Sequence, residues 1–366
     1  MKRAVLITLE YPPMIGGVGN YYKNIVDASQ GTITVLDNSA DALLSKTYWP
    51  RWMRAFFSLR TMHHAQPIDC ILVGQAIPLG TVALLFFLVY GVPYIVMTHA
   101  MDVTVPSGPQ SKWRHRLMMR TILRHARAVT TVSVFTQEYV RALGVPEQKI
   151  SVITPCPALT PEQESVTQED LSILNERYYL ANKKVIFAAG RLVERKGFYR
   201  VITAFEQIAD SALDTVCVIG GSGPQENMLK EMIAKSNYRE RILFVGKLTS
   251  HELATWYTRC TLYAMPSRAL SNGDVEGFGI TYLEANAFGK PVIAGDTGGT
   301  RDAVIHEKTG YIVDAEDSEA LGSAMEVLVT DTEKATMMGE YGRIRVQQDF
   351  QWNVRAQQLQ QVIERV

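Results

Sequence analysis

The sequence is poor in cysteine and in net charge, and each shortage excludes a class of protein. Its four cysteines, Cys70, Cys156, Cys217 and Cys260, are widely scattered and form no CxxC pair. A zinc site or a disulfide scaffold is therefore not expected, and a reducing cytoplasm is the default compartment. Lys plus Arg number 37, and Asp plus Glu also number 37. This balance argues against a general nucleic-acid binder, which would be basic overall.

Long apolar runs are also missing. The first residues predict no secretory signal, because the apolar run 4–9 is short and two prolines follow it. The uncharged stretch 70–98 is the one candidate for a membrane span, but prolines and glycines leave only residues 79–90 as a continuous helix. A bilayer needs about 20 residues. We therefore expect a buried helix at 79–90, a strand at 94–98, and a soluble or peripheral protein.

Short β-branched runs alternate with helix-length segments in both halves of the 366-residue chain. The predicted strands are 5–8, 32–36, 70–73, 94–98, 128–132 and 149–153, then 185–189, 215–219, 242–245, 262–264, 291–294 and 310–313. Continuous apolar strands that alternate with helices indicate parallel sheets covered on both faces. The polar stretch 160–170 is the best linker. We predict two Rossmann-like, doubly wound α/β domains, 1–165 and 166–349.

Positive charge is concentrated in residues 46–127, which hold 10 basic residues and only two acidic ones, Asp69 and Asp102. Aromatic residues such as Trp49, Phe57 and Trp113 lie among them. Basic residues with aromatic anchors suit an anionic membrane surface. An ordinary solvated helix face with its aromatics in the core explains the pattern equally well. RNA binding is less favoured, because no RNA-binding motif accompanies the patch.

The first strand is followed by a loop with three glycines, Gly16, Gly17 and Gly19, before a predicted helix. Glycines let a phosphate or sugar approach the backbone, and a helix N-terminus favours an anion. A dinucleotide-binding loop is the rival interpretation, with Asp37 as the ribose carboxylate. However, the loop is long, contains two prolines, and has Tyr22 where a third glycine is needed. A plain turn remains open as well.

Two similar segments follow strands of the second domain. Arg191 and Lys196 flank a short loop that enters a helix, and together they could hold a diphosphate. A surface charge cluster is the alternative. The GxG at Gly221 and Gly223 could be a phosphate loop or only a tight turn.

The most informative segment is 274–285, which contains Glu276 and Glu284 around Gly277 and Gly279. Glu276 is expected in a loop and Glu284 inside the helix that follows. One carboxylate could contact a sugar while the other binds the ribose hydroxyls of a nucleotide. Backbone N–H groups near Gly279 and Ile280 could receive phosphate oxygens. A capping Glu276 and a solvent-facing Glu284 form the alternative.

His99 ends a predicted strand of the first domain and is followed by Asp102 three residues later. A lone histidine is often a structural residue. Its place at the carboxyl end of a strand, where open α/β sheets bind ligands, favours a functional role.

Together these motifs resemble the retaining glycosyltransferases of family four, which have the GT-B fold. The resemblance covers nearly the whole chain and is most specific at Glu276-x7-Glu284. It implies two Rossmann-like domains facing across a cleft, with a C-terminal helix, 350–366, that crosses back to the N-terminal domain. The 276–277 segment looks most similar to phosphatidylinositol mannosyltransferases. The family often has His-Gly where this chain has His99-Ala100.

The resemblance also implies roles for individual residues. The Arg and Lys that grip the donor diphosphate correspond to Arg191 and Lys196, the ribose ligand to Glu284, and the sugar contacts to Glu276 and His99. The expected catalytic set is His99, Arg191, Lys196 and Glu276. The expected donor-binding set is Gly16, Gly17, Leu248, Gly277, Phe278, Gly279, Ile280 and Glu284.

We therefore expect a retaining hexosyltransferase that uses GDP-mannose first and a UDP-hexose second, with a lipid-linked or oligosaccharide acceptor. No carboxylate pair of the DxD type is evident, so we expect no metal and no other cofactor. The location would be cytoplasmic, with peripheral attachment to the inner membrane face as an option. Two other functions stay open: a non-catalytic nucleotide-sugar-binding protein, and a dinucleotide-dependent oxidoreductase, which the imperfect glycine loops disfavour.

Overall fold

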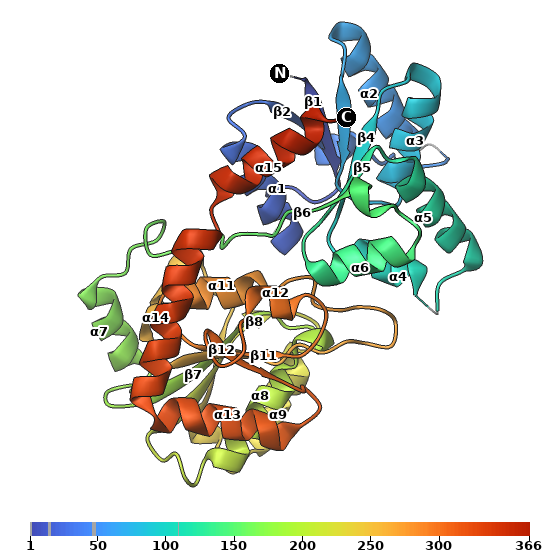
Figure 1. Ribbon diagram of the computed structural model, residues 1–366. Coiled ribbons are helices and arrows are strands. Elements are labelled where there is room, and N and C mark those ends of the chain that lie inside the picture. The colour runs from blue at the N-terminus through green and yellow to red at the C-terminus, as the bar shows by residue number, and fades with distance from the viewer. Residues whose placement is uncertain (1, 14–15, 46–48, 109) are drawn as a thin grey trace. The chain divides into compact units, whose positions relative to one another are not determined.

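All twelve predicted strands are found in the computed structural model, which describes residues 2–13, 16–45, 49–108 and 110–366 (Figure 1). They form two parallel six-stranded sheets with helices on both faces. The chain divides into an N-terminal unit, Met1–Cys156 with Ser271–Gly277 and Gln351–Val366, and a C-terminal unit, Pro157–Leu270 with Phe278–Phe350. The predicted doubly wound α/β architecture is confirmed in each unit.

The N-terminal unit is built on a sheet with the strand order β2-β1-β3-β4-β5-β6. Its strands are β1 (Ala4–Thr8), β2 (Ile33–Asp37), β3 (Cys70–Val73), β4 (Tyr94–Thr98), β5 (Ala128–Thr131) and β6 (Ile150–Val152). Its helices are α1 (Gly17–Ala28), α2 (Met53–Ala65), α3 (Leu79–Tyr90), α4 (Met101–Ser107), α5 (Trp113–His125), α6 (Val134–Ala142) and α15 (Trp352–Glu364).

Side chains of β1 alternate between the two faces of this sheet, as the period of a strand requires. Val5 and Ile7 pack in the core cluster that contains residues of α2, α3 and α5. Ala4 and Leu6 pack in the opposite cluster, which contains residues of α1 and α15. The C-terminal helix α15 thus completes the core of the N-terminal unit, as the GT-B resemblance implies.

The C-terminal unit is built on a sheet with the strand order β12-β11-β10-β7-β8-β9. Its strands are β7 (Lys184–Arg191), β8 (Thr215–Ser222), β9 (Ile242–Gly246), β10 (Leu262–Met265), β11 (Val292–Gly295) and β12 (Gly310–Val313). Its helices are α7 (Gln168–Arg177), α8 (Phe198–Ile208), α9 (Glu226–Lys235), α10 (Ser250–Arg259), α11 (Ile280–Ala287), α12 (Thr300–Ala303), α13 (Ser318–Thr330) and α14 (Thr332–Asp349).

The same alternation divides the core of the C-terminal unit. Ile186 and Ala188 of β7 pack with residues of α8 and α13. Phe187, between them, points to the other face, where its ring stacks on Trp256 of α10 at a centroid distance of 5.7 Å. Both faces of β7 are therefore buried, which explains its continuous apolar run.

Each sheet reverses its strand order at one point, between β1 and β3 in the N-terminal unit and between β7 and β10 in the C-terminal unit. In open α/β sheets, ligands bind beyond the carboxyl ends of the strands at such a point.

The borders of the two units differ from the predicted ones in two places. The first border lies at Cys156/Pro157 rather than after residue 165, and the end of the predicted linker forms the start of α7, whose Thr167 and Asp170 make a capping box. The short segment Ser271–Gly277 belongs to the N-terminal unit. The hydroxyl of Thr104 in α4 donates a 2.8 Å hydrogen bond to the carbonyl oxygen of Gly273 and anchors this segment.

Candidate functional site

The carboxyl edge of the C-terminal sheet holds the predicted diphosphate ligands. The strands β7 and β8 run further than the apolar pattern indicates, and Arg191 pairs with Ser222 as the last residue of its strand. Arg191 is thus the last residue of the strand and borders the short loop before α8, although the strand was predicted to end at residue 189. Its side chain is exposed. Lys196 follows in a single 3-10 turn, Glu194–Lys196, directly before α8.

Lys196 and the start of α11 meet at Met265, the last residue of β10. The Lys196 Nζ atom lies 3.1 Å from the Met265 Sδ atom, and the Thr281 Oγ1 atom lies 3.9 Å from the same sulfur. The aliphatic part of Lys196 passes over Gly190, where an added Cβ would lie 3.5 Å from the lysine Cδ atom. An ammonium group is thus held next to the first turn of a helix.

The first turn of α11 can offer amides to an anion. Its N-cap residue, Gly279, has φ +94° and, as a glycine, has no side chain to cap the turn. Amides at a helix N-terminus that lack a protein partner can receive an anion. Ile280 begins the helix and Thr281 follows it. The predicted phosphate-binding backbone is therefore formed by these residues.

Gly279 is required here for two reasons, its positive φ and the lack of space for a side chain. An added Cβ would lie 2.4 Å from the Cδ2 atom of Tyr282, whose hydroxyl group donates a 2.6 Å hydrogen bond to the carbonyl oxygen of Met265. We expect Gly279→Ala to lower the free energy of unfolding by roughly 2–4 kcal/mol, because backbone strain and overpacking add. Urea unfolding measures this change.

A matched control lies at the other end of the same helix. Gly289 also has a positive φ, +68°, but nothing lies within 4 Å of its added Cβ. Gly289→Ala should therefore cost only about 1 kcal/mol. Equal losses in the two variants would show that the clash with Tyr282 is absent.

Glu284 lies in α11 and is buried, with 7% of its surface exposed. The Tyr257 hydroxyl group donates a 3.3 Å hydrogen bond to its Oε2 atom. Burial raises the pKa of Glu284 from 4.5 to about 7, while hydrogen bonds from Tyr257 and the Ala158 backbone and the charge of Lys196 oppose this shift. With one hydroxyl and one backbone donor, this carboxylate can still accept further hydrogen bonds. The solvent-facing alternative for this residue is wrong.

Leu248 and Phe278 take structural positions around this edge. The side chain of Leu248 lies over Gly220 of β8, where an added Cβ would come within 2.8 Å of the leucine Cδ1 atom. Phe278 is buried and packs edge-on against Phe350 at a centroid distance of 6.2 Å.

In the N-terminal unit, His99 follows β4 and packs against two tyrosine rings that also contact each other. Its imidazole packs edge-on against Tyr21 and Tyr22, at centroid distances of 4.9 Å and 5.0 Å. Burial lowers the pKa of His99 to about 3, so the ring is neutral at physiological pH. Its Nε2 atom is buried and lacks a hydrogen-bond partner among the described residues. A buried polar atom without a hydrogen-bond partner is a candidate contact for a ligand.

The backbone around His99 is unusual. Ala100 has φ 66° and ψ −74°, and the Met101 amide donates a 3.0 Å hydrogen bond to the His99 carbonyl oxygen, which is the geometry of a strained γ-turn. The Oδ1 atom of Asp102 accepts a 2.8 Å hydrogen bond from the His99 amide. Asp102 thus fixes the backbone of His99. Burial raises the pKa of this aspartate to about 7.

Glu276 and Gly277 lie in the same unit as His99. Glu276 is buried, and an added Cβ at Gly277 would lie 3.0 Å from the His99 carbonyl oxygen. The loop position predicted for Glu276 is confirmed. Glu276 and Glu284 were predicted to lie in one domain, 166–349. They belong to different units, because the border between the units falls at Gly277/Phe278.

The glycine loop after β1 leads into α1 as predicted. Gly16 is the N-cap of α1 and Gly17 its first residue, and Gly16 has no side chain to cap the helix. The Oε2 atom of Glu10 lies 3.7 Å from the position of an added Cβ at Gly16. Met14 and Ile15 of this loop lie outside the described residues.

Several contacts that hold this site have no signal in the sequence pattern. Tyr257 reaches Glu284 from α10, Met265 joins Lys196 to α11, and Tyr22 supports His99 from α1. All are apolar or aromatic residues within buried runs. Only a spatial model of the sheet would have distinguished them from ordinary core residues.

The basic segment 46–127 divides into two parts. Phe56 of α2 is buried and Trp52 packs against the same core cluster, so for these aromatics the core interpretation is right. Trp113 of α5 is 68% exposed. Lys46 lies outside the described residues.

The described residues lack two features. None of their helices is both long enough and apolar enough to cross a bilayer. They also contain no cluster of three or more His, Cys, Asp or Glu side chains that could hold a metal ion.

Two family models match most of the chain. The glycosyl transferase 4-like domain matches residues 26–156, and the glycosyl transferases group 1 model matches residues 176–345.

Curated relatives match over the full length. A GDP-mannose-dependent alpha-(1-6)-phosphatidylinositol monomannoside mannosyltransferase of Mycolicibacterium smegmatis is 27% identical, covering 98% of this chain and 97% of its own. A GDP-mannose-dependent monoacylated alpha-(1-6)-phosphatidylinositol monomannoside mannosyltransferase of Corynebacterium glutamicum is 28% identical, with 99% and 98% covered.

Solved structures share the fold. Anabaena HepE in complex with UDP-glucose has a TM-score of 0.82 at 19% identity, with 99% of this chain and 100% of that chain covered. Sucrose-phosphate synthase of Thermosynechococcus elongatus has a TM-score of 0.81 at 21% identity, with 100% and 98% covered.

Proposed function

Since this chain belongs to the GT-B glycosyltransferases that combine a glycosyl transferase 4-like domain with a group 1 domain, we propose that it transfers mannose from GDP-mannose to a lipid-linked acceptor. One observation carries the nucleotide-sugar part of the proposal. Lys196, the uncapped start of α11 and the buried carboxylate of Glu284 gather at the carboxyl edge of one sheet.

The reaction's main barrier is the departure of a nucleoside diphosphate from the sugar. Arg191, Lys196 and the amides around Ile280 would stabilise the negative charge that develops on the leaving group. Glu284 would accept hydrogen bonds from ribose hydroxyls, and the backbone near Leu248 would border the base. We assign contacts with the transferred sugar to His99 and Glu276.

Two finer parts of the proposal concern the chemistry. Arg191 and Lys196 would supply the positive charge that a metal ion otherwise supplies at a diphosphate, so we propose a metal-independent transfer. We also propose that the configuration at the anomeric carbon is retained. Activity should be unchanged by a chelator. The one-bond coupling between the anomeric carbon and its proton in the product, measured by NMR, should match that of the donor.

The identity of the donor and acceptor rests on the relatives. Those that match over the full length are named for GDP-mannose and for phosphatidylinositol mannosides. A UDP-hexose is the second candidate, because a solved structure of the same fold holds UDP-glucose.

A donor panel tests the proposal. The purified protein is incubated with a lipid extract and either GDP-mannose, UDP-glucose, UDP-galactose or UDP-N-acetylglucosamine, and released nucleoside diphosphate is measured. We expect acceptor-dependent release of GDP from GDP-mannose. Release of UDP alone would overturn the mannose assignment. Saturable donor binding without any release would instead support the non-catalytic binding protein left open by the sequence.

A further inference from the structure

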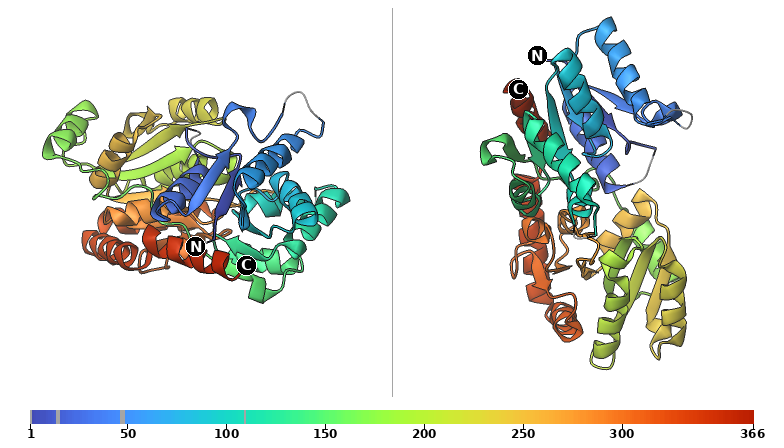
Figure 2. Two further views of the ribbon diagram at one scale, coloured as in Figure 1. Left: turned by 90° about the horizontal axis from the view of Figure 1, so that it is seen from above. Right: turned by 90° about the vertical axis from the view of Figure 1, so that its right-hand side faces the viewer.

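The helices α2, α3 and α5 lie side by side on one face of the N-terminal sheet, and the right-hand view of Figure 2 turns their outer side toward the reader. The middle helix, α3, has the sequence LGTVALLFFLVY and contains no charged residue. Its inner side is buried in the core, but Leu88 and Val89 are 68% and 56% exposed. A water-facing helix normally carries charged residues on its outer side, so this surface calls for another explanation.

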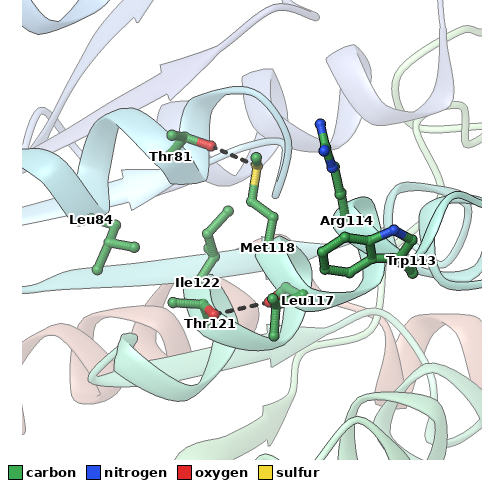
Figure 3. Close-up of a pocket in the computed structure, with 8 residues that line it drawn as sticks. All are labelled: Thr81, Leu84, Trp113, Arg114, Leu117, Met118, Thr121 and Ile122. Atoms are coloured by element: carbon green, nitrogen blue, oxygen red, sulfur yellow. Dashed lines mark hydrogen bonds between the residues drawn. The ribbon is translucent and has the colours of Figure 1, made fainter.

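The neighbouring helix α5 adds to this apolar surface. Leu117 is 57% exposed and Met118 38% exposed, beside the exposed ring of Trp113. Between α3 and α5 is a shallow groove with a volume of about 370 Å³ (Figure 3). Thr81 and Leu84 line it from α3. The residues that line it from α5 are Trp113, Arg114, Leu117, Met118, Thr121 and Ile122.

Every charged residue on the flanking helices is basic. α5 carries Arg114, Arg116, Arg120 and Arg124, and α2 carries Arg54 and Arg60, while neither helix contains an Asp or Glu. The Arg114 guanidinium lies 5.6 Å from the centre of the Trp113 ring, so charge and aromatic surface are adjacent. We name the outer side of α3 and α5, with Leu88, Trp113, Leu117, Met118 and Arg120, the α3–α5 face.

We propose that the α3–α5 face docks onto an anionic phospholipid bilayer. The apolar side chains would enter the boundary between headgroups and acyl chains, and the groove would take the upper part of an acyl chain. The arginines would contact lipid phosphates. Apolar and aromatic residues bordered by cations are the composition of surfaces that lie in a membrane interface.

Charge decides between this partner and a second copy of the chain. A two-fold interface places the same patch on both sides, so it would bring the arginines of α5 against one another. Anionic lipids neutralise them instead. The inference goes beyond the proposed function, because vesicle binding is measured with neither donor nor acceptor present.

The test is co-sedimentation of the full-length protein with vesicles of phosphatidylcholine alone, or of phosphatidylcholine mixed with phosphatidylglycerol. We expect binding to the anionic vesicles only, weakened by added salt. Arg120→Glu should reduce the partition coefficient at least about fivefold, and Leu117→Ser about tenfold.

The C-terminal unit offers matched controls. Leu213 is 71% exposed, and the side chain of Arg239 is 65% exposed. Leu213→Ser and Arg239→Glu should bind vesicles like the unaltered protein, and all four variants should keep its melting temperature. The proposal is overturned if both vesicle types bind equally or if Leu117→Ser and Arg120→Glu match their controls. A concentration-dependent dimer that Leu117→Ser abolishes, without vesicle binding, would assign the face to a second copy.

Discussion

Replacement of Lys196 by alanine is expected to lower kcat for sugar transfer by about 10²–10³-fold, while the protein stays folded. The ammonium group lies beside the start of α11, where the diphosphate would leave. Loss of one group that stabilises developing charge in the transition state has an effect of this size. Because the charge develops as the bond breaks, the change should appear mainly in kcat, with a smaller change in KM.

Lys230→Ala is the matched control for this variant. Lys230 belongs to the same unit, and its side chain is 52% exposed in α9. Released nucleoside diphosphate measures kcat, and circular dichroism checks the fold. If Lys196→Ala changes only KM, then the lysine binds the donor without stabilising the leaving group. If it is as active as Lys230→Ala, the diphosphate site lies elsewhere.

Replacement of Glu284 by glutamine is expected to separate activity from stability. The amide would lose a charged acceptor for ribose hydroxyls, a loss of about 10- to 100-fold in kcat/KM. The same variant should be more stable than the unaltered protein above pH 7, because it no longer buries an ionisable carboxyl group whose pKa is raised to about 7.

The sign of this pH effect follows from proton binding. Between pH 4.5 and about 7 the folded protein retains the Glu284 proton that the unfolded chain loses. The free energy of unfolding therefore falls as pH rises through this window, by about 3 kcal/mol in all. Glutamine does not titrate, so the stability gain of Glu284→Gln should be near zero at about pH 4 and largest at about pH 8.

Thermal unfolding at the two pH values measures this gain. Glu319→Gln in α13 is the control for the loss of an acidic side chain, since Glu319 is exposed. If the stability difference between Glu284→Gln and the unaltered protein is the same at both pH values, the carboxyl group is not desolvated. Full activity would remove Glu284 from the donor site.

The sheets could be predicted from the sequence because their information is local. Runs such as 70–73 and 94–98 are entirely buried strands, and the helix Leu79–Tyr90 has the predicted bounds. The ends of β7 and β8 were missed, because Gly190 and Gly221 look like loop residues. In the structure they pair with each other, and an added Cβ at Gly221 would lie 1.9 Å from the Gly190 carbonyl oxygen. Close packing of backbones, not a turn, requires that glycine.

The candidate site could be predicted in part. Arg191, Lys196 and Glu284 were found from their places after strands, and the structure brings them to one sheet edge. The division of Glu276 from Glu284 could not be predicted, because it depends on the anchoring of Gly273 by Thr104, a residue far away in sequence. The role of Asp102 also required coordinates, because its hydrogen bond is to the backbone of His99.

The path of the chain has a consequence for how the protein matures. Helix α15 supplies Ala356, Leu359, Val362 and Ile363 to the core of the N-terminal unit, and Trp352 lies 5.6 Å from the Tyr21 ring that flanks His99. A ribosome delivers α15 after the whole C-terminal unit, so one side of the first sheet stays uncovered until that unit has been made. Sequential, domain-by-domain folding, the usual course for larger proteins, is therefore not open to this one: the core of its N-terminal unit is finished by a helix made after the C-terminal unit.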